Sequence, residues 1–184
     1  MRKSIIAILM TFCLSIMTYA QTPRDRATEL KEQAQSSLNQ KDYIKARYLF
    51  KKAYEAFAPR ENYPQAIECG VQANALYVRE NFYKEGFELC RDMDQLIWAG
   101  EQNQKKVFYD LRFLVNKERL QMYTALKNPA QAKTQLNKLE ETANLAKNDS
   151  LTEVLLYTKA NYYYTFNQNT QGDACFRKLI NQYK

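Results

Sequence analysis

Apolar residues recur every three or four positions along nearly the whole chain after residue 22, and this helical periodicity constrains the fold more than any other feature. Short polar or proline-containing breaks interrupt the pattern, and no segment keeps the two-residue alternation of a strand. Only four glycines and four prolines occur in 184 residues, which disfavours a loop-rich all-β fold. The pattern predicts an all-α domain with helices at 22–38, 43–57, 64–80, 82–98, 101–126, 129–146, 150–166 and 171–183.

Three local signals place helix ends within this pattern. Thr22 stands before Pro23, which predicts an N-cap followed by proline at the first helical position. Gly100 is expected to end a helix by adopting the left-handed conformation. Ser150 and Glu153 have the spacing of a capping box and predict the start of the seventh helix.

The first twenty residues have the three-part layout of a secretory signal peptide. A basic start at Arg2 and Lys3 precedes an apolar run over residues 4–17, and small residues then lead to Ala20. The run is shorter than the roughly 20 apolar residues that a membrane span needs. We therefore expect cleavage after Ala20 and a periplasmic or otherwise exported domain over residues 21–184, with an uncleaved anchor as the alternative.

The charge distribution does not favour nucleic acid. Loss of Arg2 and Lys3 lowers the formal net charge from +7 to +5, and the remaining cations are scattered among acids without a basic block. A nucleic-acid-binding surface concentrates its cations, so no nucleic-acid partner is expected.

Catalytic and metal-binding groups are sparse. The chain contains no histidine, which removes Ser–His and Cys–His nucleophiles and most catalytic zinc sites. Paired acids such as Asp92 with Asp94, or Glu140 with Glu141, are too close in sequence to share a helix face. The sequence predicts no enzyme activity, no metal and no cofactor.

Three cysteines follow the signal segment, at Cys69, Cys90 and Cys175. An odd number in an exported chain leaves at least one free thiol. Two arrangements are compatible with the spacing: a Cys69–Cys90 bridge across one hairpin, or three small buried core residues, which we favour.

A short repeated element indicates that the helices form four hairpins. In the second helix of each pair, a small residue is followed four positions later by a bulky or apolar residue. A further apolar residue lies three positions after that one, seven after the small residue. The small residue lets two helices approach closely, and the apolar side chains after it fill the groove. The small residues lie 40, 46 and 40 positions apart; they are Ala46, Gly86, Ala132 and Gly172.

This element resembles the tetratricopeptide repeat (TPR) family, most closely from Ala34 to Ala53. The other three units are degenerate, and their period exceeds the usual 34 residues. The resemblance implies a right-handed α–α superhelix of about four hairpins whose first helices line a concave binding surface.

The same resemblance, carried over residue by residue, gives a set of polar and aromatic candidates on the concave face. It implies a protein or peptide partner with an acidic group, although the family's lysine–asparagine clamp is not reproduced, because Gln35 follows Lys31. The candidate ligand-binding residues are Lys31, Gln35, Asn39, Arg79, Lys117, Gln121, Tyr157, Asn161 and Tyr164, with Val71, Ala75 and Thr124 at equivalent positions.

Two functions fit this reading. The first is a non-enzymatic scaffold or adaptor that binds a peptide or protein. The second is the sensory domain of a membrane-bound bacterial signalling or transcriptional regulator, since exported TPR segments of such regulators look similar. Membrane association is expected only through an uncleaved signal or sequence further along. Ile180 and Tyr183 lie where a further hairpin would pack. We expect them to meet a partner or a second copy, to pack locally, or to be followed by further sequence.

Overall fold

The computed structural model describes residues 25–181, and within them the chain is all-helical, as predicted. The expected signal segment, Thr22 and Tyr183 lie outside these residues. The eight α-helices are α2 (Arg26–Asn39), α3 (Tyr43–Phe57), α4 (Tyr63–Arg79), α5 (Tyr83–Gln104), α6 (Tyr109–Ala125), α7 (Pro129–Ala146), α8 (Asp149–Thr165) and α9 (Asn169–Asn181), with a short 3-10 helix, η1, at Ala58–Arg60.

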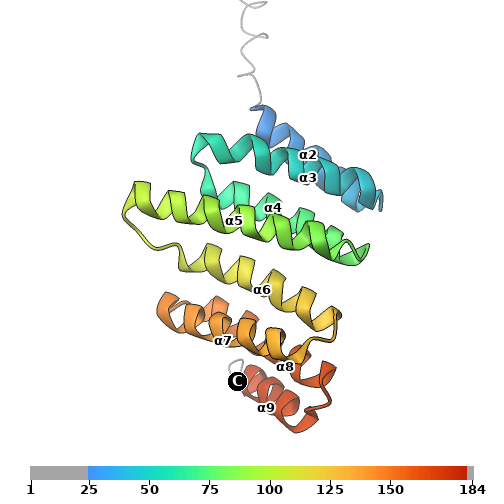
Figure 1. The fold of residues 1–184 in the computed structure, drawn as a ribbon, viewed down its shortest axis with the longest axis vertical. Helices are drawn as coiled ribbons and strands as arrows, with labels where there is room; N and C mark the ends of the chain where they lie inside the picture. Colours follow the sequence, from blue (N-terminus) through green and yellow to red (C-terminus); the bar gives the residue numbers. More distant parts are fainter. Residues whose placement is uncertain (1–24, 182–184) are drawn as a thin grey trace, which may run out of the picture.

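The helices are stacked in chain order along the longest axis of the molecule (Figure 1). Consecutive helices pair across short turns as α2–α3, α4–α5, α6–α7 and α8–α9. The small residues of the repeated element are buried in all four hairpins. Close approach of the paired helices, which the element predicts, therefore occurs in each unit.

The turn inside each hairpin has the same backbone conformation. One non-glycine residue adopts a positive φ, and the N–H of the next residue donates to a carbonyl five positions earlier, at 2.8–2.9 Å. This is a helix-ending arrangement that satisfies carbonyls at the C-terminus of the first helix. The positive-φ residues are Lys41, Asn81, Lys127 and Asn167. Each precedes the buried small residue by five positions, so turn and packing element repeat together.

The prediction that Gly100 ends a helix is wrong. The residue lies inside α5, which continues to Gln104, and no glycine in residues 25–181 has a positive φ. A Cβ atom at Gly100 would lie 2.8 Å from Cε2 of Phe108 and 2.9 Å from Cζ of Tyr63. Glycine is needed here because two aromatic rings pack against the helix backbone.

Acidic and amide side chains cap the first and seventh of these helices, and the predicted cap at Ser150 is displaced. The first helix begins at Arg26, because the side chain of Asp25 accepts a hydrogen bond from the N–H of Ala27. The seventh begins at Asp149, and its cap is Asn148, whose side chain accepts from the N–H of Ser150 at 3.0 Å. Ser150 lies within the first turn of α8, so the asparagine directly before the helix provides the cap.

The apolar core forms two clusters, and α6 contributes to both. Val115 and Met122 pack with the first two hairpins, whereas Phe113 and Leu120 pack with α7 and α8. A helix with buried residues on two faces links the halves of the molecule.

The three cysteines are free and buried, as favoured from the sequence. Burial raises the pKa of Cys69 to about 11 and that of Cys90 to about 12. Both side chains therefore stay protonated and act as small core residues near neutral pH.

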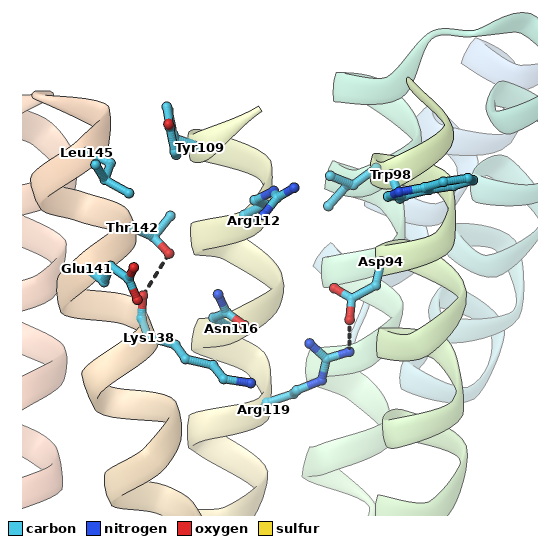
Figure 2. Close-up of a pocket in the computed structure, with 11 residues that line it drawn as sticks. Asp94, Trp98, Tyr109, Arg112, Asn116, Arg119, Lys138, Glu141, Thr142 and Leu145 are labelled. Carbon is cyan, nitrogen blue, oxygen red and sulfur yellow. Dashed lines mark hydrogen bonds and ion pairs between the residues drawn. The ribbon is translucent and has the colours of Figure 1, made fainter. Parts of the chain in front are cut away.

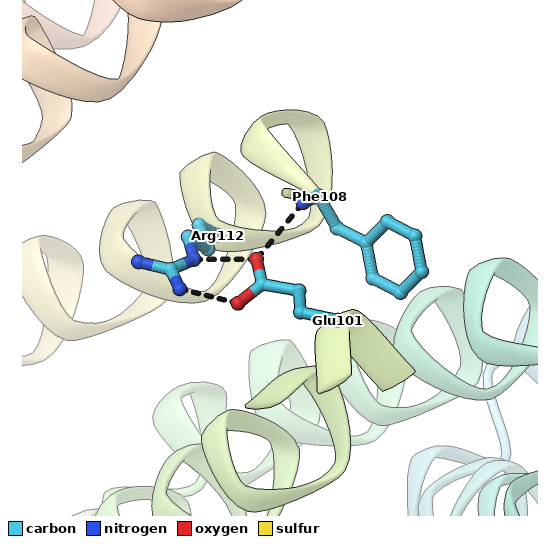
Figure 3. Close-up of polar contacts among 3 residues, drawn as sticks. All are labelled: Glu101, Phe108 and Arg112. Carbon is cyan, nitrogen blue, oxygen red and sulfur yellow. Dashed lines mark hydrogen bonds and ion pairs between the residues drawn. The ribbon is translucent and has the colours of Figure 1, made fainter. Parts of the chain in front are cut away.

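Glu101 fixes the position of α6 relative to α5 (Figure 3). Its buried carboxylate accepts hydrogen bonds from the backbone N–H of Phe108 at 2.8 Å and from Nε of Arg112 at 2.7 Å, and Nη2 of Arg112 pairs with its other oxygen. Phe108 is the N-cap residue of α6, and its side chain cannot accept a hydrogen bond from the first turn of the helix. The carboxylate from α5 therefore satisfies a donor at the start of the next hairpin.

The outer side of α9 is only partly covered. Ile180 is exposed and Leu179 is half-buried in this last described helix. This matches the expected position of Ile180, while a partner at this surface stays a prediction.

Candidate functional site

A groove between α6 and α8 brings together five of the residues predicted to face a ligand. It has a volume of about 460 Å³. Lys117, Gln121 and Thr124 enter it from α6, and Tyr157 and Asn161 enter it from α8. These two helices are the first members of successive hairpins, which is the relation that the repeat alignment predicted.

The groove combines cationic, amide and apolar groups. Lys127 lies at the turn that ends α6, and Val154 and Tyr157 expose 40% and 55% of their surface. The hydroxyl of Thr158 donates to the carbonyl of Val154, so it is engaged within its own helix. The exposed amides of Gln121 and Asn161 are the neutral hydrogen-bonding groups best placed for a ligand.

Lys117 also lies close to the buried carboxylate of Glu118. Its ammonium lies 3.5 Å from Oε1 of Glu118, and Nδ2 of Asn74 donates to Oε2 at 3.2 Å. Burial raises the pKa of Glu118, and the nearby Lys117 charge and the Asn74 hydrogen bond only partly offset this rise. The carbonyl oxygen of the Asn74 side chain has no hydrogen-bond donor.

Replacing Glu118 with glutamine is expected to stabilise the protein by about 1–2 kcal/mol near neutral pH. The substitution removes a buried charge and adds an amide that can donate to the unpaired oxygen of Asn74. The pKa of Glu118 is higher in the folded protein than in the unfolded chain, where it is about 4.3. The free energy of unfolding of the wild type should therefore increase as the pH falls from the folded-state pKa toward 4.3. The advantage of E118Q should therefore shrink on acidification, as measured by urea unfolding at several pH values. A less stable E118Q at neutral pH would show that Lys117 fully compensates the charge.

The predicted residues of the first two hairpins do not join the groove. Nζ of Lys31 contacts Gln65 and Glu68 of α4, each at 2.7 Å, and Nε2 of Gln35 donates to Asn39 at 3.1 Å. The guanidinium carbon of Arg79 lies 3.9 Å from the ring centroid of Tyr43. These side chains make contacts within or between helices of the chain.

Tyr164 also lies outside the groove. Its ring packs over Gly172 of α9 and stacks on Phe176 with 5.9 Å between centroids, and its hydroxyl donates to Asp173. The ring can pack against α9 because Gly172 has no side chain there. The two preceding tyrosines pack instead into the second core cluster, where Tyr162 is buried and Tyr163 is half-buried.

The structure shows a second groove that the sequence analysis missed, running between α5 and α7 over α6 (Figure 2). Arg112, Asn116 and Arg119 of α6 form its floor, and the ion pair between Arg119 and Asp94 of α5 measures 2.5 Å. The spacing of the three floor residues along one face of α6 was the only sequence signal available.

Comparisons with protein families, curated proteins and solved structures find no match to this chain. Within residues 25–181, no helix combines the length and hydropathy needed to cross a membrane. The same residues contain no cluster of three or more side chains suited to holding a metal ion.

Proposed function

We propose that this protein is an exported, non-enzymatic TPR-like interaction module whose hairpins form a right-handed superhelix. The observation that carries the proposal is the α6–α8 groove, built from corresponding helices of successive hairpins. The repeated turn and packing element supports a repeat architecture, since both recur at intervals of 40, 46 and 40 residues. Repeat arrays generally bind partners along such extended surfaces.

The groove chemistry favours a peptide segment that carries an acidic group and an apolar side chain. Lys117 and Lys127 provide positive charge, Gln121 and Asn161 match the donors and acceptors of a peptide backbone, and Tyr157 offers an amphipathic ring. The net positive charge of the chain acts in the same direction by attracting acidic partners.

A peptide-display selection against the full chain tests this function. We expect enriched peptides to contain an acidic residue, and the double substitution Lys127→Glu with Tyr157→Ala to weaken their binding at least about tenfold. The variant avoids Lys117, whose loss would disturb buried Glu118.

A matched control uses Lys41→Glu with Tyr48→Ala in the first hairpin. Lys41 occupies the same positive-φ turn position as Lys127, and Tyr48 is 60% exposed, close to the 55% of Tyr157. This control should bind like wild type. Failure to enrich any peptide, or equal losses in both double variants, would refute the α6–α8 groove as the binding site.

A further inference from the structure

The α5–α6–α7 groove is separate from the site proposed for peptides. It has a volume of about 430 Å³. Its floor residues on α6, Arg112, Asn116 and Arg119, precede Lys117, Gln121 and Thr124 by five positions each. Five residues correspond to about 140° around an α-helix. The two grooves therefore use roughly opposite faces of α6.

The charges in and around this groove are partly fixed in place by ion pairs. Arg119 pairs with Asp94 (Figure 2), and Arg112 pairs with Glu101, which is not part of the lining. Lys138 and Glu141 of α7 lie on the same rim. The lining carries three cations and two carboxylates, and the carboxylate of Glu101 neutralises Arg112 from outside the lining. With that ion pair included, no net charge remains with which to select a phosphate or a polyacid. Side chains already held by ion pairs lose little freedom when a ligand binds.

The floor offers both hydrogen-bond donors and acceptors. Half-buried Asn116 lies between the two arginines, and its amide has no hydrogen-bond partner within residues 25–181. Asp94 remains half-exposed beside Arg119, and the ammonium of Lys138 has no ion-pair partner in the same described part of the chain. Hydroxyl groups suit such a surface because each one both donates and accepts.

The apolar part of the groove lies at its open rim. Trp98 is 63% exposed and Leu145 is 52% exposed, so neither forms a closed pocket that would desolvate an apolar peptide side chain. An exposed indole instead provides a flat face for the C–H groups of a ring whose other edge carries polar groups. We propose that this groove binds a neutral oligosaccharide, with one sugar ring against Trp98 and hydroxyl groups directed to Asp94, Asn116 and Arg119.

Trp98 is the only tryptophan in the chain, which makes it a direct reporter of the groove. The full chain is titrated with maltohexaose, cellohexaose, mannohexaose and chitohexaose, while tryptophan emission is followed. We expect at least one of these neutral oligosaccharides to change the emission saturably, with a Kd below about 1 mM. Acidic oligogalacturonate and a glutamate-rich peptide serve as comparison ligands. No response to the four neutral probes, or a stronger response to either acidic ligand, would overturn the proposal.

Variants then locate the binding. Calorimetry with the responding oligosaccharide is expected to show at least about tenfold weaker binding for Asn116→Ala and for Trp98→Ala. Trp98→Tyr, which keeps an aromatic face, should recover part of the loss. Tyr48→Ala removes an equally exposed aromatic from α3 and should bind like wild type. Unchanged affinity in Asn116→Ala and Trp98→Ala, with wild-type thermal unfolding, would also overturn the proposal.

Discussion

Replacing Phe50 with alanine is expected to lower the free energy of unfolding by about 3–5 kcal/mol. Phe50 is 1% exposed and belongs to the cluster that joins the first two hairpins. Removing the ring loses its transfer free energy and leaves a cavity that the surrounding helices fill only in part. Because domains of this size are commonly stable by about 5–15 kcal/mol, the loss is large, and urea unfolding followed by far-UV circular dichroism measures it.

Phe176 gives the matched control, because it occupies the corresponding position of the repeated element in the fourth hairpin. It is only half-buried, against Tyr157 and Tyr164. Phe176→Ala should therefore cost less than half as much as Phe50→Ala. Equal losses would contradict the assignment of Phe50 to a closed core and of Phe176 to a partly open end.

The second large effect is expected at Glu101. Substitution by alanine should destabilise the protein by about 2–4 kcal/mol, because hydrogen bonds to charged groups contribute about 1.5–3 kcal/mol each. The change leaves the N–H of Phe108 without its acceptor and frees Arg112, which is exposed enough to be hydrated. The free energy of unfolding of E101A at neutral pH checks this expectation.

The pH dependence gives an independent test of the same contacts. Burial alone would raise the pKa of Glu101, but hydrogen bonds from Arg112 and from the Phe108 amide outweigh it and lower the pKa. Because the pKa of Glu101 is lower in the folded protein than in the unfolded chain, its charge stabilises the fold above the unfolded-state pKa of about 4.3. This stabilisation is lost as the pH falls through the folded-state pKa. The difference in free energy of unfolding between wild type and E101A should therefore stay constant near neutral pH. It should decrease below about pH 4.3, as measured by urea unfolding at several pH values.

Glu88→Ala serves as the control for Glu101, since Glu88 is an exposed glutamate on the same helix, α5. Its removal should change stability by less than about 0.5 kcal/mol. A loss similar to that of E101A would mean that helix propensity or net charge, rather than the contacts between hairpins, causes the effect.

The repeated element was predictable because it depends on spacing within single helices. Ala46 and Phe50 lie one turn apart on one face of α3, and a small residue followed by a bulky one packs in the same way wherever two helices approach closely. The periodicity alone thus indicated eight helices and four hairpins. The left-handed residues of the turns were not predicted. Asn81 and Asn167 are typical of that conformation, but Lys41 and Lys127 at the equivalent turns are not, so residue type gives no common signal.

Helix ends were harder to predict where distant residues decided them. Gly100 has the local signature of a helix end, yet Tyr63 and Phe108 pack against it inside α5. Tyr164 likewise turns toward α9 because Gly172 leaves space there. No pattern within one helix contains that information.

The sequence by itself determined the helices, their pairing and the first-helix residues that meet in the α6–α8 groove, because helical spacing decides which side chains share a face. Only the tertiary structure decided which of those side chains are engaged by neighbours, as Lys31 is by Glu68. It also brought Asp94 to Arg119 across two hairpins and so formed the second groove. Contacts between hairpins depend on the relative position of neighbouring helices. For α5 and α6, the hydrogen bonds from Phe108 and Arg112 to the carboxylate of Glu101 help to hold that position.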